Sequence, residues 1–186
     1  MNSKTASLRV KQLTLTAMTA ALICIFSPLS IPIGPVPISL ATLAVMFAGA
    51  FLGPVRGTAS AAVYLLLGMA GLPVFAGFRG GIGVIAGPTG GFLIGYMPLA
   101  AICGLGTLFA AKKLWIRAVA LTSLCIAGTA VLYAIGTAWF CAVTASTLTA
   151  AITVCVLPFL PGDALKIASC VILILSLKRR STYEIF

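Results

Sequence analysis

Charged side chains are so scarce in this sequence that their scarcity decides the class of fold. Only 8% of the 186 residues are charged, whereas 61% are apolar. A water-soluble domain carries roughly 25% charged residues, because polar groups must cover its surface. Intrinsic disorder is excluded as well, since a disordered chain has low hydrophobicity. The composition therefore predicts an integral membrane protein.

Six apolar runs approach or exceed the length of about 20 residues that a transmembrane helix needs. We therefore predict an all-α integral membrane protein with six transmembrane helices, forming a single membrane domain over residues 1–186. The predicted spans cover residues 13–27, 38–52, 58–72, 91–111, 116–141 and 162–177. Four prolines predict a rigid, uncharged loop over residues 28–37, because proline interrupts a helix. A glycine-rich loop over residues 73–90 follows the third span.

The basic residues predict how these spans are oriented. With six spans, ten of the twelve lysines and arginines fall in segments on the same side as the N-terminus. They are Lys4, Arg9, Lys11, Arg56, Lys112, Lys113, Arg117, Lys178, Arg179 and Arg180. The positive-inside rule assigns this side to the cytoplasm. Both termini are therefore predicted to be cytoplasmic, and the glycine-rich loop is predicted to face outward.

One apolar run of ambiguous length, residues 147–157, could be a seventh span. A seventh span would move the C-terminal basic cluster outside, against the positive-inside rule. Residues 143–158 are therefore predicted to form an outer segment that does not cross the membrane.

Acid–base residues are too few for most enzymes. The sequence has no histidine, and its only side-chain carboxylates are Asp163 and Glu184. General acid–base and metal-assisted catalysis both draw on these residue types. We therefore expect no enzyme, no catalytic residue, no metal site and no cofactor. We also expect no nucleic-acid binding, because the basic residues lie in short clusters between apolar runs and not in one patch.

Two ionisable residues stand at the start of the last predicted span. Asp163 and Lys166 follow Pro161-Gly162, a pattern typical of a helix start. A spacing of three puts both side chains on one helical face. An ionisable residue inside a span is costly and is a candidate functional residue. Two interpretations remain open: an internal ion pair with Asp163 as N-cap, or a pair that also contacts a polar ligand.

The glycine-rich loop is the second unusual feature. Gly77, Gly81 and Gly83 are among its glycines, and Phe75 and Phe78 lie in the same stretch. Glycine allows close approach of the backbone to a ligand, or movement of a flap. The alternatives are a flexible loop, or close helix packing by glycines spaced four apart from Gly87 onward. The two phenylalanines argue against a purely flexible linker.

Small residues recur at helical spacing in the first predicted span. Ala17 and Ala21 lie four apart, with Thr16 and Ala20 beside them. Such a face lets another helix approach closely. The pattern alone does not decide between packing within the chain and binding of a partner.

These motifs together resemble one known family. They include Gly71-Leu72-Pro73-Val74-Phe75, Gly80-Gly81-x-Gly83, Gly87-Pro88-Thr89-Gly90-Gly91 and Pro161-Gly162-Asp163-x-x-Lys166. Ile33-Gly34-Pro35-Val36-Pro37-Ile38 and Gly53-Pro54-x-x-Gly57 fit the same pattern. The chain resembles, over nearly its whole length and in order, the BioY family. Members are the biotin-binding S components of energy-coupling factor (ECF) transporters.

The resemblance implies a function and a set of partners. It implies the six-helix S-component fold, with high-affinity capture of biotin from outside for uptake by an ECF-type ABC importer. The implied partners are a transmembrane coupling subunit and two cytoplasmic ATPase subunits, in the plasma membrane of a bacterium. Ala17 and Ala21 match the family's docking motif for the coupling subunit. Transport in the family is thought to involve toppling of the S component in the bilayer.

The resemblance also implies where biotin binds: in a pocket between the glycine-rich loop and the start of the sixth helix. Asp163 would accept from the ureido N–H groups of biotin, and Lys166 would donate to its C=O. Apart from the resemblance, Arg79 is the only cation in the outer loop, and we therefore expect it to bind the valerate carboxylate, with loop amides as alternatives. The full set of expected ligand-binding residues is Asp163, Lys166, Arg79, Phe75, Gly77, Phe78, Gly81, Gly83, Thr89, Gly90, Phe92 and Tyr96.

Three positions depart from the family pattern. Some members have Asn at the position of Arg79, an Arg at the position of Leu93, and Gln at the position of Ala41. Those contacts do not carry over to this chain. Two alternative functions also remain: an S component for another vitamin, such as thiamine or riboflavin, and a biotin carrier that works without a coupling module.

Overall fold

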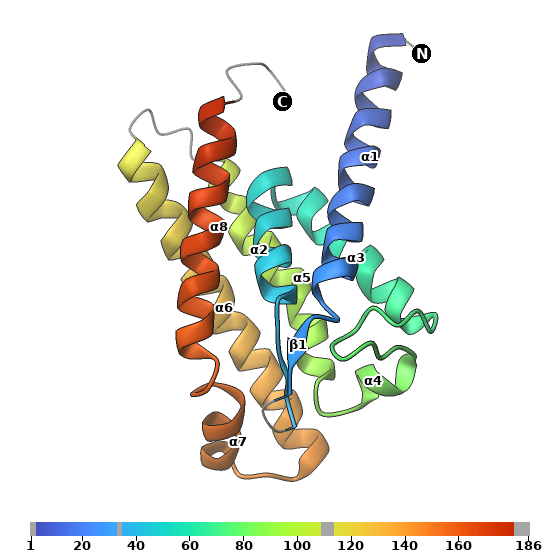
Figure 1. Ribbon diagram of the computed structural model, residues 1–186, viewed down its shortest axis with the longest axis vertical. Helices are drawn as coiled ribbons and strands as arrows, with labels where there is room; N and C mark the ends of the chain where they lie inside the picture. The colour runs from blue at the N-terminus through green and yellow to red at the C-terminus, as the bar shows by residue number, and fades with distance from the viewer. Residues whose placement is uncertain (1–2, 33–34, 109–113, 181–186) are drawn as a thin grey trace.

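The protein is a bundle of helices with one very short β-hairpin (Figure 1). The computed structural model describes residues 3–32, 35–108 and 114–180. In chain order the elements are α1 (Ser3–Phe26), β1 (Ser30–Ile31), β2 (Ile38–Ser39), α2 (Ala41–Leu52), α3 (Pro54–Met69), α4 (Ile82–Ala86), α5 (Gly90–Gly104), η1 (Leu105–Thr107), α6 (Leu114–Thr144), α7 (Leu148–Cys155) and α8 (Leu160–Arg180).

Four helical segments in the described part of the chain are long and apolar enough to cross a membrane. They are Ser7–Phe26, Gly90–Thr107, Leu114–Thr144 and Leu160–Leu177. A helix lies in each of the other two predicted spans, but α2 has only 12 residues and α3 only 16. At 1.5 Å per residue α2 is about 18 Å long, well short of a hydrocarbon core of about 30 Å. The count of six spanning helices is therefore not confirmed.

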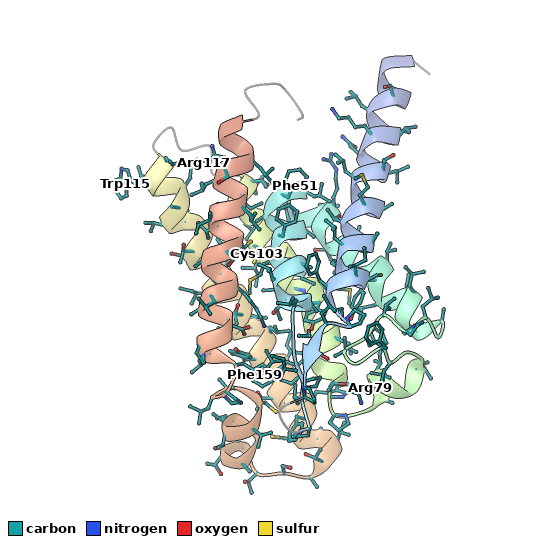
Figure 2. The ribbon with its side chains drawn as sticks, in the orientation of Figure 1. Phe51, Arg79, Cys103, Trp115, Arg117 and Phe159 are labelled. Atoms are coloured by element: carbon teal, nitrogen blue, oxygen red, sulfur yellow. The ribbon has the colours of Figure 1, made fainter. Side chains whose placement is uncertain are left out.

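The two ends of the bundle carry different segments. The start of α1 and the end of α8 lie at one end, whereas α4, α7 and the hairpin lie at the other (Figure 1). Arg117 lies toward the first end and Arg79 toward the second (Figure 2). The start of α1, the end of α8 and Arg117, which are predicted to share a side of the membrane, thus lie toward the same end of the molecule. Lys112 and Lys113 lie outside the described residues.

Helix α2 lies inside the bundle, packed against α1, α3, α5 and α8. Small residues make this possible. A Cβ atom at Gly49 of α2 would overlap the backbone of Ala100 in α5, and one at Gly57 of α3 would overlap the backbone of Gly49. The backbones of α2, α3 and α5 therefore touch, which is the close packing that small residues allow in membrane proteins.

The proline-rich segment differs from its prediction. Residues 28–37 were expected to form a rigid loop, and residue 38 to begin a span. Instead, Ser30 pairs with Ser39 and Ile31 with Ile38 in an antiparallel hairpin, and α2 begins only at Ala41. Prolines exclude a helix here but not a short extended strand.

Other predicted boundaries also shift. Helix α3 covers Pro54–Met69 and not 58–72. It begins earlier because a helix accommodates proline in its first turn, and it ends earlier because the backbone departs from helical geometry at Gly71, where φ is +100°. The loop predicted over residues 73–90 contains α4. Helix α6 reaches Thr144, and the following α7 has eight residues, too short to span a membrane. The predicted end of the fourth span, at residue 111, lies outside the described residues.

Candidate ligand-binding site

A small cavity lies where the hairpin, the glycine-rich loop and the start of α5 meet. Its volume is about 40 Å³, room for roughly three water molecules. The lining residues are Val36, Pro37, Ser39, Phe75, Ala76, Arg79, Val84, Thr89, Phe92, Leu93 and Tyr96. The walls are mainly apolar and aromatic, and Arg79 is the only charged residue among those that line them.

Phe75 anchors the glycine-rich loop to the helices. Its side chain is 1% exposed, and its ring meets Tyr64 edge to face with ring centroids 5.5 Å apart. The ring lies against Gly68 of α3, where a Cβ atom would overlap it. The Tyr64 hydroxyl in turn shares a 2.6 Å hydrogen bond with Ser27 at the end of α1. Phe75 thus fixes the loop and forms a cavity wall at the same time.

Arg79 closes a tight turn beside Phe75. The Phe75 amide donates to the Arg79 carbonyl at 2.8 Å, and the Arg79 Nε donates to the Ala76 carbonyl at 3.2 Å. The Gly77 amide donates to the Pro28 carbonyl at 3.2 Å, which connects this turn to the segment that leads into the hairpin. The guanidinium is exposed at the end of the molecule (Figure 2) and retains donors for an anionic group.

Trp139 of α6 holds the second half of the loop. Its Nε1 donates to the Gly87 carbonyl at 3.0 Å. A Cβ atom at Gly91 would overlap the Trp139 side chain, and one at Gly90 would overlap the carbonyl of Ile85. These glycines therefore allow close packing, in agreement with the packing alternative considered for this stretch.

Asp163 and Lys166 form a buried ion pair on α8. Lys166 Nζ donates to Asp163 Oδ1 at 2.8 Å, and the two residues are 6% and 4% exposed. The Tyr133 hydroxyl of α6 donates to Asp163 Oδ2. Since α8 begins at Leu160, Asp163 lies within the first turn, and its carboxylate bonds the side chains of Tyr133 and Lys166 and not the backbone amides that an N-cap would bind. The spacing of three residues does place the Asp163 and Lys166 side chains on one face of α8, as predicted.

The ion pair lies outside the lining of the small cavity. Asp163 and Tyr133 instead line a larger, mostly apolar groove of about 590 Å³ between α6 and α8. Tyr96, by contrast, lines the small cavity.

The structure brings five of the twelve expected ligand-binding residues to the cavity. They are Phe75, Arg79, Thr89, Phe92 and Tyr96. Gly77, Gly81, Gly83 and Gly90 do not line it, and Phe78 is 68% exposed. Gly77 and Gly81 have φ angles of +69° and +94°, so they serve the turns of the loop.

Several residues around the site were not expected from the sequence. Ser39 and its neighbours in the hairpin were missed because the proline-rich segment was predicted as a plain loop. Leu93, a position that departs from the family pattern, lines the cavity. Tyr133 was missed although a tyrosine in the middle of an apolar span is a signal, since its hydroxyl needs a polar partner there.

The small residues of α1 lie on the outside of the bundle. Ala17 and Ala21 are exposed, whereas Thr19 and Ala20 are buried. The Thr19 hydroxyl shares a 2.7 Å hydrogen bond with Ser60 of α3. Helix α1 therefore packs against α3 through its Thr19 face, and the Ala17–Ala21 face is left exposed.

The helical bundle and its apolar spans define an α-helical membrane protein. The structure is similar to the crystal structure of the S-component for biotin from an ECF-type ABC transporter, with a TM-score of 0.81, 31% identity, and coverage of 96% of this chain and 95% of that one. The model of the BioY family matches residues 1–183. The chain belongs to the BioY family.

Named relatives match along most of their length. The "Probable biotin transporter BioY" of Pyrococcus horikoshii is 39% identical over 166 residues, which cover 89% of this chain and 95% of the relative. The "Biotin transporter BioY" of Thermotoga maritima is 36% identical over 173 residues, which cover 91% and 97% respectively. The family is one of transporter components and not of enzymes.

Proposed function

We propose that this protein is the biotin-binding subunit of an ECF-type ABC importer and mediates uptake of biotin into the cell. The observation that carries the proposal is the buried Asp163–Lys166 pair, in a bundle that also holds a separate aromatic cavity. Burying two charges inside a membrane span is costly, so an ion pair at such a position indicates a role beyond stability. Membership of the BioY family and the likeness to a biotin S-component support biotin as the ligand.

The chemistry of biotin suits these groups. Its ureido ring has two N–H donors and one C=O acceptor, which the Asp163 carboxylate and the Lys166 ammonium complement. Its bicyclic thioether would pack against Phe75, Phe92 and Tyr96. Its valerate carboxylate would bind the Arg79 guanidinium. In this assignment biotin is the transported ligand and not a cofactor.

Binding requires the cavity to enlarge. A volume of about 40 Å³ is far too small for a bicyclic vitamin. The glycine-rich loop is attached to the helices at a few points: the Phe75 ring, the Gly77 amide, the Gly81 amide, which donates to the Gly68 carbonyl of α3 at 2.7 Å, and the Trp139 hydrogen bond. We propose that this loop swings outward to admit biotin and closes over it.

The same proposal extends to topology and partners. We propose six membrane-spanning helices, with α2 and α3 completing their spans together with the segments that flank them. Both termini would lie in the cytoplasm and the glycine-rich loop outside, in the plasma membrane of a bacterium. The exposed Ala17–Ala21 face would dock on a transmembrane coupling subunit that carries two cytoplasmic ATPases.

Equilibrium binding tests the proposal directly. The purified protein in detergent is titrated with labelled biotin, and unlabelled biotin, thiamine and riboflavin are then added as competitors. We expect saturable binding that only biotin displaces. Displacement by thiamine or riboflavin, or no binding of biotin, would refute the proposed ligand.

A further inference from the structure

Both oxygens of the Asp163 carboxylate have a partner, and the two partners come from different helices. Lys166 of α8 donates to Oδ1, and Tyr133 of α6 donates to Oδ2. A carboxylate can accept about four hydrogen bonds, and these two donors leave lone pairs on each oxygen. The group is therefore fixed in orientation and can still accept from a ligand.

The position of Tyr133 determines which side of the carboxylate remains available. Tyr133 and Asp163 both line the groove between α6 and α8, so their hydrogen bond lies at the wall of that groove. Neither Tyr133 nor Asp163 lines the small cavity. The Tyr133 hydroxyl thus occupies the carboxylate at the groove wall, and the lone pairs that point away from this wall are left for a ligand.

We propose that Tyr133 is a positioning residue for ligand recognition: it holds the Asp163 carboxylate so that its free lone pairs point away from the groove wall and accept from the ureido N–H groups. This inference rests on the proposed function, because it assigns a role to Tyr133 through Asp163 in biotin binding. Tyr133 does not itself contact the ligand. Without the Tyr133 hydroxyl, the Asp163 carboxylate is held only by its bond to Lys166 and can rotate, so the geometry in which it accepts from the ligand is lost.

The sequence offers an unusually clean probe of this contact. Asp163 is the only aspartate in the chain. Cell-free synthesis with aspartate carrying ¹³C in its side-chain carboxyl therefore labels one site. The infrared carboxylate band of that label reports the hydrogen bonds that Asp163 accepts.

The experiment compares the labelled wild type with Tyr133→Phe, which removes only the hydroxyl. The control is Thr129→Val, one turn earlier on α6, where the hydroxyl donates to the Cys125 carbonyl and not to Asp163. We expect biotin to shift the Asp163 band in the wild type. Tyr133→Phe should shift the Asp163 band before ligand is added and reduce the affinity for biotin about tenfold or more. Thr129→Val should change neither the band nor the affinity.

Each other outcome is informative. An Asp163 band that ignores Tyr133→Phe, or a biotin affinity within twofold of wild type, overturns the positioning role. Tighter binding by Tyr133→Phe also overturns it, since the hydroxyl would then compete with the ligand. A wild type that binds no biotin refutes the proposed function instead, and a wild type that binds biotin without a band shift refutes the Asp163 contact.

Discussion

The Asp163–Lys166 pair offers a test that separates stability from ligand binding. Lys166→Met removes the ammonium but keeps an unbranched side chain of similar length. The Asp163 carboxylate, which is 4% exposed, would then be buried with Tyr133 as its remaining partner. Breaking a buried pair in this way costs about 3–5 kcal/mol, because one charge is left uncompensated. We therefore expect ligand-free Lys166→Met to be less stable by about 3 kcal/mol or more.

The double variant Asp163→Asn/Lys166→Met should behave differently. It removes both charges while keeping an oxygen to accept from Tyr133, and replacing a whole buried pair is often close to neutral. Its stability without ligand should therefore return to within about 1 kcal/mol of wild type. Its affinity for biotin should nevertheless remain weakened, because both ureido partners are gone.

Two measurements on the same detergent-purified samples decide the matter. Denaturant unfolding without ligand gives stability, and isothermal titration gives the affinity for biotin. If Lys166→Met were as stable as wild type, the expected cost of leaving the buried Asp163 charge without its ammonium partner would be contradicted. A double variant that binds biotin as tightly as wild type would contradict the assignment of the pair to the ureido group.

Three further changes test other parts of the molecule. Arg79→Ala should reduce the affinity for biotin more than the affinity for biotinamide, which lacks the anionic carboxylate. Equal losses would reject the tail contact. Arg56→Ala, near the start of α3, is the matched control. Trp139→Phe keeps a ring but loses the bond to the Gly87 carbonyl, so we expect thermal unfolding to show a loss of about 1 kcal/mol, and an unchanged melting curve would count against the anchor. Ala17→Trp adds bulk to an exposed face, so uptake by cells should be abolished while purified protein still binds biotin; normal uptake would reject docking at this face.

The sequence predicts well those features that depend on local spacing. A separation of three puts Asp163 and Lys166 on one helical face, and the structure has them paired at 2.8 Å. The apolar runs locate the long helices, although α1, α6 and α8 extend beyond the runs that predict them. The run over residues 147–157 was ambiguous by its length, and the positive-inside rule was needed to predict that it does not span the membrane; α7, with eight residues, is too short to do so.

Features that depend on how helices pack are not readable in the same way. Tyr133 lies 30 residues before Asp163, and only the packing of α6 against α8 brings them together. In sequence, Gly91 fits both a loop motif and the packing pattern of glycines spaced four apart, which continues to Gly95. In the structure the two glycines lie against Trp139 and Leu132 of α6, so their role is close helix packing.

The hairpin shows a third limit. Prolines exclude a helix between residues 28 and 37, but they leave open whether the extended chain pairs with itself. The pairing of Ser30 with Ser39 brings Ser39 to the cavity, a position that the proline pattern could not assign.

The backbone contacts among α2, α3 and α5 limit the motions open to this protein. Gly49 lies against Ala100, Gly57 against Gly49, and Gly104 against Pro54, with no side chain between them. Helices joined in this way cannot slide or rotate past one another without a clash, since no flexible side chains are present to adjust. Any large reorientation within the bilayer would therefore carry these three helices together as a rigid body. Movement within the protein would be left to the loop that covers the cavity.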